Sequence, residues 1–472
     1  MDVEEVISVI NQAALKEASE LDLSGLGLRS VPPQVWNLAN LTFLDLGHNE
    51  LTALPSEIGY LTNLTGLILA DNQLIGLPPE IVKLAQLDKL SVSDNHLAAL
   101  APEMFDLANL TYLDLSGNQL TKLPPEIGNL TSLRDLDLHN NQLTELPPEI
   151  VQLAQLRILS LGHNPLTALP PEIFKFPDLE ELYLGSAINT RLPPEIGNLT
   201  SLRHLFLRGN QLTELPPEIS NLTGLTNLSL NGNQLTALPP EIGSLTGLRH
   251  LSLNGNQITV LPPEIGNLTS LRYLSLARNQ LTDLPPEIGK LTRLTILSLY
   301  GNQLTGLPPE IGNLTWLESL SLDSNQLTVL PPGIGNLTRL ARLSLDGNQL
   351  TVLPPEIGSL ARLTDMSLDS NLLTELPPEI GELAGLESLS LGNNRLTAIP
   401  KSMVKLEKLS QGRWFAGGFI PSGRIVCPKP RQSLLTPTGL DLSHNLLTIL
   451  PTEINQLREE WGIDLSGNPL MS

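Results

Sequence analysis

Leucine and other apolar residues recur along the chain in a pattern that repeats every 23 positions. One repeat opens with Leu44 and Leu46, which alternate with variable positions, and the next repeat opens with Leu67. Alternation with a period of two is typical of a β-strand that has one buried face. The pattern therefore predicts one short strand at the start of each repeat.

The register of this repeat hardly drifts along the chain. The first strand leucine, or its substitute, falls at Leu21, Leu44, Leu67, Leu90, Leu113, Leu136, Leu159, Leu182, Leu205, Leu228, Leu251, Leu274, Leu297, Leu320, Leu343, Met366, Leu389, Leu440 and Ile463. A single repeat cannot bury its own leucines, so neighbouring repeats complete a continuous core and their strands lie side by side in parallel. The sequence predicts a solenoid instead of several closed domains.

Two other positions of the repeat have a structural explanation. An asparagine such as Asn118 follows the strand in most repeats, where its amide can satisfy backbone groups of its own and adjacent turns. Pro124 and Pro125 cannot donate to a sheet and set the backbone for a turn or a short helix. Glu126 would then lie at the N-terminus of that helix, where the helix dipole favours a carboxylate. We interpret the asparagine ladder and the recurring glutamate as architectural.

These residues, in the order Leu-x-x-Leu-x-Leu-x-x-Asn-x-Leu-Thr-x-Leu-Pro-Pro-Glu-Ile-Gly-x-Leu, resemble the leucine-rich repeat, specifically its 23-residue intracellular class. The resemblance covers nearly the whole chain. In appearance the repeats are similar to those of Scribble and Ras-regulator type proteins and to the repeat region of bacterial Roco proteins. The resemblance implies an α/β repeat solenoid, a horseshoe or superhelix with a parallel β-sheet on the concave face and short helical or irregular segments on the convex face.

The pattern divides the chain into four parts. Apolar residues at helical spacing predict an N-terminal capping helix in residues 1–20, followed by the repeat solenoid over 21–409. Glycine, proline and basic residues predict an irregular insertion or degenerate repeat at 410–439, for which a functional loop and a harmless insertion both stay open. The final two repeats and the C-terminal end occupy 440–472. A smaller break places Ala187 where a ladder asparagine belongs.

Composition narrows the classes of function. The formal charge of −21 argues against a nucleic-acid backbone or an anionic membrane as the main partner. The first residues do not have the pattern of a secretory signal, no apolar run approaches membrane-spanning length, and Cys427 is the only cysteine. We therefore expect a cytoplasmic protein that does not insert into a membrane.

The sequence offers little chemistry for catalysis. The seven histidines are spread along the chain, and Cys427 has no evident histidine partner. The glycine-rich phosphate-binding loop of Roco GTPases does not occur, because Gly289 and Lys290 are followed by Leu291 and are not preceded by the required glycine. We expect no catalytic residue, no metal site and no cofactor.

Variable strand positions in the middle of the chain favour partner binding. Between the two strand leucines most repeats there carry serine, but Tyr183 and Phe206 occupy this position in two neighbouring repeats. Aromatic, arginine and asparagine side chains dominate the hot spots of protein interfaces. The candidate partner-binding residues are Tyr183, Arg203, His204, Phe206, Arg208, Asn231, His250, Asn254, Tyr273, Arg278 and Tyr300.

Farther along, the concave face turns acidic, so its charge would orient a partner. The acidic residues are Glu318, Asp323, Asp346, Asp365, Asp369 and Glu387. The simpler alternative is that all these side chains are solvated variable positions. Members of the resembled family are mostly protein-binding scaffolds in signalling, which favours a non-enzymatic scaffold or adaptor that docks a partner protein of unknown identity on the concave face. A regulatory repeat region separated from a Roco-type GTPase is the alternative, and a small-molecule or carbohydrate binder with sparse aromatics is a third.

Overall fold

The computed structural model describes residues 3–167, 169, 171–187, 191–411, 440–457 and 461–470. Most of the predicted insertion at 410–439, including Cys427, lies outside the described residues. The chain forms two compact units, Met1–Leu235 and Thr236–Ser472. We call them unit 1 and unit 2 and describe each by itself.

Unit 1 begins with helix α1 (Val3–Leu15), which buries Val6 and Ile10. Its strands are β1 (Glu20–Asp22), β2 (Phe43–Asp45), β3 (Gly66–Ile68), β4 (Lys89–Ser91), β5 (Tyr112–Asp114), β6 (Asp135–Asp137), β7 (Ile158–Ser160), β8 (Glu181–Tyr183), β9 (His204–Phe206) and β10 (Asn227–Ser229). Its 3-10 helices are η1 (Pro33–Asn37), η2 (Ser56–Tyr60), η3 (Pro79–Lys83), η4 (Pro102–Asp106), η5 (Pro125–Asn129), η6 (Pro148–Gln152), η7 (Pro171–Lys175), η8 (Pro194–Asn198) and η9 (Pro217–Asn221).

Unit 2 repeats the same alternation. Its strands are β11 (His250–Ser252), β12 (Tyr273–Ser275), β13 (Ile296–Ser298), β14 (Ser319–Ser321), β15 (Arg342–Ser344), β16 (Asp365–Ser367), β17 (Ser388–Ser390) and β18 (Leu440–Asp441). Its helices are η10 (Pro240–Ser244), η11 (Pro263–Asn267), η12 (Pro286–Lys290), η13 (Pro309–Asn313), η14 (Pro332–Asn336), η15 (Pro355–Ser359), η16 (Pro378–Glu382), η17 (Lys401–Lys405), η18 (Glu407–Gln411) and α2 (Thr452–Gln456).

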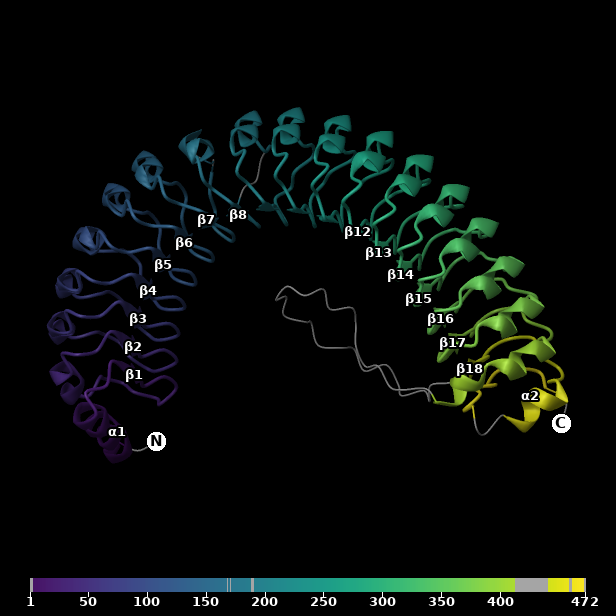
Figure 1. Ribbon diagram of the computed structural model, residues 1–472, viewed down its shortest axis with the longest axis horizontal. Helices are drawn as coiled ribbons and strands as arrows, with labels where there is room; N and C mark the ends of the chain where they lie inside the picture. The colour runs from purple at the N-terminus through teal and green to yellow at the C-terminus, as the bar shows by residue number, and fades with distance from the viewer. Residues whose placement is uncertain are drawn as a thin grey trace. The chain divides into compact units, whose positions relative to one another are not determined.

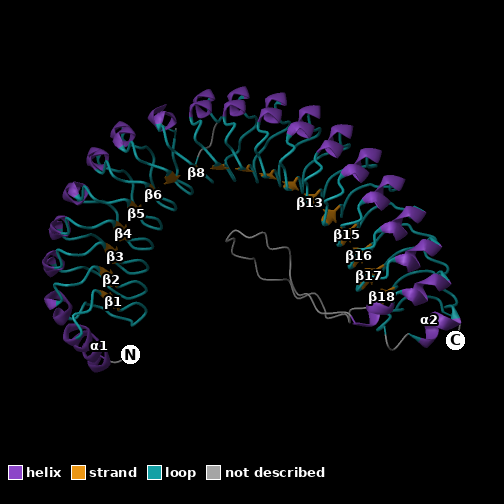
Figure 2. Cartoon of the chain, viewed as in Figure 1, coloured by secondary structure: helices purple, strands orange, loops and turns teal. Residues whose placement is uncertain are grey.

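Consecutive strands within each unit pair in parallel and in the register that the repeat predicts. Leu21 stands opposite Leu44 in unit 1, and Leu274 stands opposite Leu297 in unit 2. The other pairs of each unit follow the same rule. Within each unit the strands line the inner, concave side of the repeats and the short helices lie on the outer side (Figure 1, Figure 2). Each unit is therefore a repeat solenoid, as predicted.

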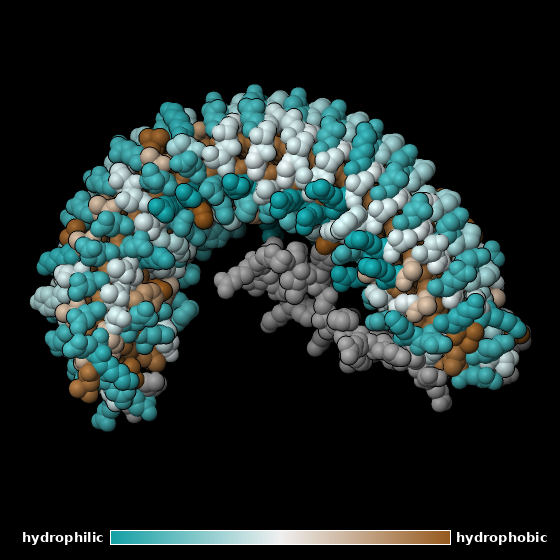
Figure 3. All heavy atoms as spheres, in the orientation of Figure 1, coloured by the Kyte–Doolittle hydropathy of each residue, from teal (hydrophilic) through white to brown (hydrophobic). Residues whose placement is uncertain are grey.

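The core of each unit lies between the strands and the short helices. In a typical repeat Leu113, Leu115, Leu120 and Leu130 are all fully or almost fully buried. Hydrophilic side chains cover most of the outer edge of both units, and apolar residues are confined to small patches (Figure 3). The leucine pattern therefore separates a continuous apolar interior from a polar surface.

The asparagine ladder is confirmed. Asn118 Nδ2 donates to the carbonyl oxygen of Val92 in the preceding repeat at 2.9 Å and to that of Leu115 at 3.1 Å. Its Oδ1 accepts from the N–H of Leu97 at 3.0 Å. Each ladder asparagine thus replaces hydrogen bonds that the turning backbone cannot make with itself.

The double proline begins a helix, as predicted, but the helix is a single 3-10 turn. In η5, Pro125 is the first residue and Pro124 precedes it in an extended conformation. Glu126 lies in this first turn, without a side-chain cap on the helix. Because the helix has five residues, its dipole is small, and the proline geometry explains the turn better than the glutamate charge does.

The turn after each strand uses the left-handed backbone region. Gly232 has φ of +66°, and glycine pays no steric cost there. Other repeats place a side chain at the same position, for example Asp71, Arg278 and Ser324, with φ of 53° to 55°. These non-glycine positions carry a local conformational cost that the rest of the repeat offsets.

Candidate protein-binding surface

Two aromatic rings lie stacked on the concave face of unit 1. Tyr183 of β8 and Phe206 of β9 stand in register, and their ring centroids lie 4.5 Å apart with planes inclined by 8°. Both side chains are half-buried. The neighbouring strands carry Ser160 and Ser229 at the same position. The pair is therefore a local apolar feature flanked by serines.

Hydrogen bonds and ring contacts hold this aromatic pair. The Tyr183 hydroxyl donates to Glu181 Oε2 at 2.5 Å, and burial together with this carboxylate raises the pKa of Tyr183. The ring of His204 meets Phe206 edge-on at 6.3 Å, and His204 Nδ1 lies 3.6 Å from Glu181 Oε1. Because neighbouring groups orient the rings, little side-chain freedom remains to be lost on binding.

The other predicted residues of unit 1 surround this pair with polar groups. Arg203 Nε lies 3.8 Å from Glu180 Oε2, and Arg157 Nη1 lies 3.4 Å from Glu180 Oε1. These ion pairs are largely exposed and contribute little to stability. Arg208 is exposed, and Asn231 Nδ2 donates to the Ser229 hydroxyl at 3.2 Å. The arginines are therefore accessible for contacts with a partner.

Unit 1 also contains a pocket of about 380 Å³ that the sequence did not predict as a site. It is lined by Tyr112, Asp135, Leu136, Asp137, His139, Ile158, Ser160, Glu181 and Tyr183. Burial, followed by the nearby carboxylates of Asp114, Asp137 and Asp135, raises the pKa of Tyr112 to about 12. Burial also raises the pKa of Asp137. The signal in the sequence is the succession of aspartates that replaces serine in these repeats.

The eleven predicted residues divide between the two units. Unit 2 holds His250, Asn254, Tyr273, Arg278 and Tyr300. The rings of His250 and Tyr273 lie 6.2 Å apart, and the Arg278 guanidinium lies 5.6 Å from the centre of the Tyr300 ring. Asn254 Oδ1 accepts hydrogen bonds from the Ser275 hydroxyl and the Ala277 N–H, at 2.5 and 2.8 Å. Asn254 is therefore part of the scaffold.

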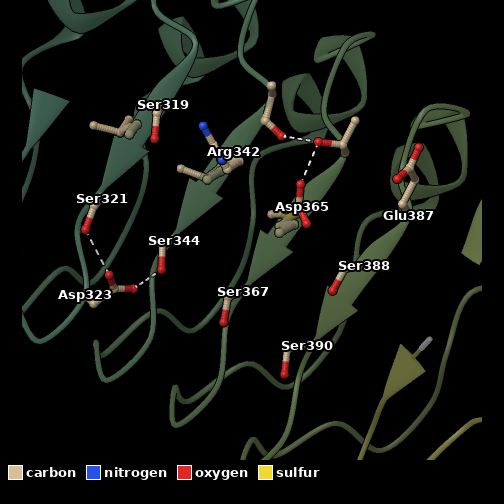
Figure 4. Close-up of a pocket in the computed structure, with 15 residues that line it drawn as sticks. Ser319, Ser321, Asp323, Arg342, Ser344, Asp365, Ser367, Glu387, Ser388 and Ser390 are labelled. Carbon is tan, nitrogen blue, oxygen red and sulfur yellow. Dashed lines mark hydrogen bonds between the residues drawn. The ribbon is translucent and has the colours of Figure 1, made fainter. Parts of the chain in front are cut away.

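The acidic face of unit 2 is built by a second hydrogen-bonded ladder. Asp323 accepts from the Ser344 hydroxyl (Figure 4). It also accepts from the N–H of Asp346 at 2.9 Å. Asp346 accepts in the same way from Ser367 and the Asp369 N–H, and Asp369 accepts from Ser390 and the Gly392 N–H. Each aspartate thus fixes the strand end of the following repeat. The sequence signal is an aspartate followed 21 residues later by serine.

Beside this ladder lies a pocket of about 700 Å³. Its lining includes Ser319, Arg342 and Asp365, which Figure 4 shows on successive strands, and Glu387, which directly precedes β17. Burial raises the pKa of Asp346 to about 6, and it also raises the pKa of Asp369. The structure therefore brings most of the predicted acidic residues together on unit 2. Several of them are more buried than solvated side chains at variable surface positions would be.

Two histidines that are distant in the sequence are in contact. The rings of His139 and His163 lie 4.9 Å apart in an edge-to-face arrangement. Burial, the His139 charge and Arg208 lower the pKa of His163. Among the described residues, no group of three or more histidine, cysteine or acidic side chains is arranged to hold a metal ion, and no helix is long and apolar enough to cross a membrane.

Family models match most of the chain. A model described as a leucine-rich repeat region matches residues 98–193, 187–272 and 263–369, and two further leucine-rich repeat models match 361–411 and 40–61. The chain belongs to the leucine-rich repeat family. No curated protein gives a significant match to the chain.

Solved structures with the same fold come from several kinds of organism. A leucine-rich repeat protein of Leptospira interrogans is 45% identical, with a TM-score of 0.74, over 76% of this chain and 93% of that one. The ectodomain of the Arabidopsis thaliana receptor kinase GASSHO1/SCHENGEN3, in complex with CASPARIAN STRIP INTEGRITY FACTOR 2, is 32% identical, with a TM-score of 0.73, over 93% of this chain and 55% of that one. YopM from Yersinia enterocolitica is 28% identical, with a TM-score of 0.59, over 95% of this chain and 83% of that one.

Proposed function

We propose that this protein is a non-enzymatic scaffold or adaptor in cytoplasmic signalling, and that it docks a partner protein on the concave face of unit 1. The leucine-rich repeat fold commonly mediates protein binding. The plant receptor ectodomain with the same fold is in complex with CASPARIAN STRIP INTEGRITY FACTOR 2. These likenesses support a binding role, and the residues of unit 1 support its location.

The observation that carries the proposal is the Tyr183 and Phe206 stack. Two aromatic rings in contact, half-exposed and held by neighbouring groups, are the kind of anchor that supplies most of the energy of a protein interface. The flanking Arg203 and Arg208 are exposed and add polar contacts at the rim. The rings occupy strand positions where serine suffices elsewhere, so folding alone does not require them.

The test replaces both rings by the serine that the flanking repeats carry. Affinity capture from native lysate with the intact chain would identify a partner by mass spectrometry, and calorimetry with the purified partner would give its Kd. We expect Tyr183→Ser with Phe206→Ser to weaken binding about 30-fold or more, the effect of losing a hot spot of about 2 kcal/mol. Tyr60→Ser, which removes an exposed ring from η2, is the matched control and should leave the Kd unchanged.

Thermal unfolding separates loss of binding from loss of folding. We expect both variants to melt at the temperature of the parent chain, because the substituted side chains are partly or largely exposed. A partner that binds the double variant as tightly as it binds the parent would contradict the assignment of this surface.

A further inference from the structure

We propose that unit 2 carries a second binding site, for an anionic polysaccharide, on the flank that leads from each short helix to the next strand. Four consecutive repeats place Arg293, Trp316, Arg339 and Arg362 at the same position, 23 residues apart. We call these four residues the Arg/Trp row. They stand on an acidic protein, and three of the four are arginine.

The row has no evident structural task. At the same repeat position elsewhere, short polar side chains bond back to the preceding repeat: Asn63 and Asn109 donate to the carbonyl oxygens of Ala39 and Ala85, and Ser201 donates to that of Pro177. The side chains of the row do not form this hydrogen bond with any described residue. None of the three arginines forms an ion pair with another described residue.

Trp316 is the exposed centre of the row. Half of it, 51%, is accessible to solvent, whereas Trp36 and Trp461 are buried. The Arg339 guanidinium lies 3.9 Å from the centre of the Trp316 ring, a cation–π contact that holds both side chains against the surface. The arrangement therefore presents a fixed aromatic ring beside a fixed cation.

A shallow groove of about 810 Å³ runs beside the row. It is lined by Gly289, Thr292, Gly312, Asn313, Thr315, Gly335, Asn336, Thr338 and Ser359, so the polar groups of its side chains are hydroxyls and amides. The three threonines of this lining directly precede Arg293, Trp316 and Arg339 in the chain. None of these lining residues has a large apolar side chain.

The Arg/Trp row and the polar groove together fit an anionic polysaccharide better than an acidic peptide or a single-stranded nucleic acid. Hydroxyls and amides can both donate to and accept from sugar hydroxyls, and guanidinium groups bind carboxylate or sulfate oxygens with two parallel hydrogen bonds. The Trp316 indole stays half-exposed although Arg339 lies over its ring, and its remaining apolar surface can contact one sugar ring. A single-stranded nucleic acid would be expected to stack on several aromatic rings in succession, and the row has only one. Arginine clusters also bind acidic peptides, and polyglutamate tests that outcome.

The experiment measures binding to the intact chain by calorimetry and by acrylamide quenching of tryptophan fluorescence. The probes are a polygalacturonate oligosaccharide, a heparin oligosaccharide, a neutral glucan, polyglutamate and a single-stranded oligonucleotide. We expect one or both anionic sugars to bind at low salt, to weaken as salt is added and to reduce the quenching of Trp316. The two sugars distinguish carboxylate from sulfate recognition.

Variants then locate the site. We expect Trp316→Ser and Arg339→Ser each to raise the Kd about tenfold or more. Serine is the residue that other repeats carry at this position, as in Ser132 and Ser270, so the fold should be kept. The charge control replaces Lys83, Lys122 and Lys405, three exposed lysines outside the row, by serine and should bind normally.

Several results would overturn the proposal. They are an absence of binding by both anionic sugars, unchanged binding in the row variants, an equal loss in the lysine control, or equal affinity for the neutral glucan, polyglutamate or the oligonucleotide. None of these results bears on Tyr183 and Phe206, so the two proposals fail independently.

Discussion

Replacement of Asn325 by alanine is expected to remove the hydrogen bonds of one step of the asparagine ladder of unit 2 and to destabilise the chain locally. Asn325 is buried, and its Nδ2 donates to the carbonyl oxygens of Leu299 and Leu322 at 3.0 and 2.9 Å. Its Oδ1 accepts from the N–H of Leu304 at 3.0 Å. Alanine keeps the backbone but removes all these hydrogen bonds.

The size of the expected loss of stability depends on which backbone groups keep another hydrogen-bond partner when the Asn325 amide is removed. The carbonyl of Leu299 also accepts from Asn302, and that of Leu322 also accepts from Asn348. The N–H of Leu304 has no other hydrogen-bond acceptor among the described residues. An unpaired buried N–H costs about 1–3 kcal/mol, and each of the two lost hydrogen bonds to a carbonyl that keeps another donor contributes about 0.5 kcal/mol more. The expected loss of local stability is about 2–4 kcal/mol.

Hydrogen–deuterium exchange with mass spectrometry measures this loss where it occurs. A local loss of about 2–4 kcal/mol corresponds to roughly 30- to 900-fold faster exchange in peptides that cover residues 299–304. Peptides from unit 1 should keep their rates, because each repeat interacts mainly with its neighbours. Asn313→Ala is the control, since Asn313 is exposed. An Asn325→Ala chain that exchanges like this control would refute the stabilising role of the ladder.

Two further predictions concern unit 2. The pKa of Asp346 is about 6 in the folded chain, against an ordinary value of 3.8, so the unfolded chain releases its proton first and stability falls as the pH rises between these values. Asp346→Asn keeps an oxygen that can accept the hydrogen bond from Ser367, just as Asn254 accepts one from Ser275. This variant should therefore raise the urea midpoint of unfolding at neutral pH and leave it unchanged below about pH 4. A lower midpoint at neutral pH would contradict this expectation. Ser324 has φ of 55°, in the region that favours glycine, so Ser324→Gly should stabilise the chain by about 0.5–1 kcal/mol in the same assay. Ser321→Gly in β14 is the control and should destabilise the chain. The opposite order of stabilities would show that backbone strain at Ser324 does not reduce stability.

The repeat made most of the fold predictable. The 23-residue spacing fixes which strands are neighbours, and the alternation within each strand fixes which side chains enter the core. The pairing of Leu21 with Leu44 and the bonds of Asn118 were both expected on this basis, and both are found. The expected helix at Pro125 is a single 3-10 turn, because one short turn already closes the repeat.

The surface was less predictable. Neighbouring repeats placed Tyr183 beside Phe206, yet the near-parallel stack and the bond from Tyr183 to Glu181 depend on rotamers that the sequence does not give. Asn254 was predicted to contact a partner, and that stays a prediction; its amide oxygen also holds Ser275 and Ala277, which the sequence did not indicate. A polar residue on a strand can serve the scaffold or face a ligand, and only its contacts distinguish the two.

The sequence by itself determined the class of fold, the strand register and the buried face, because these depend on periodic burial of leucine, which is local and additive along the stack. The tertiary structure alone decided how side chains from different repeats meet. Ser344 reaches Asp323 across 21 residues, Arg339 lies over the Trp316 ring across 23, and Asp346 is buried deeply enough among neighbouring repeats to raise its own pKa. Such contacts depend on rotamer, burial and charge at adjacent repeats together, and no single repeat contains that information.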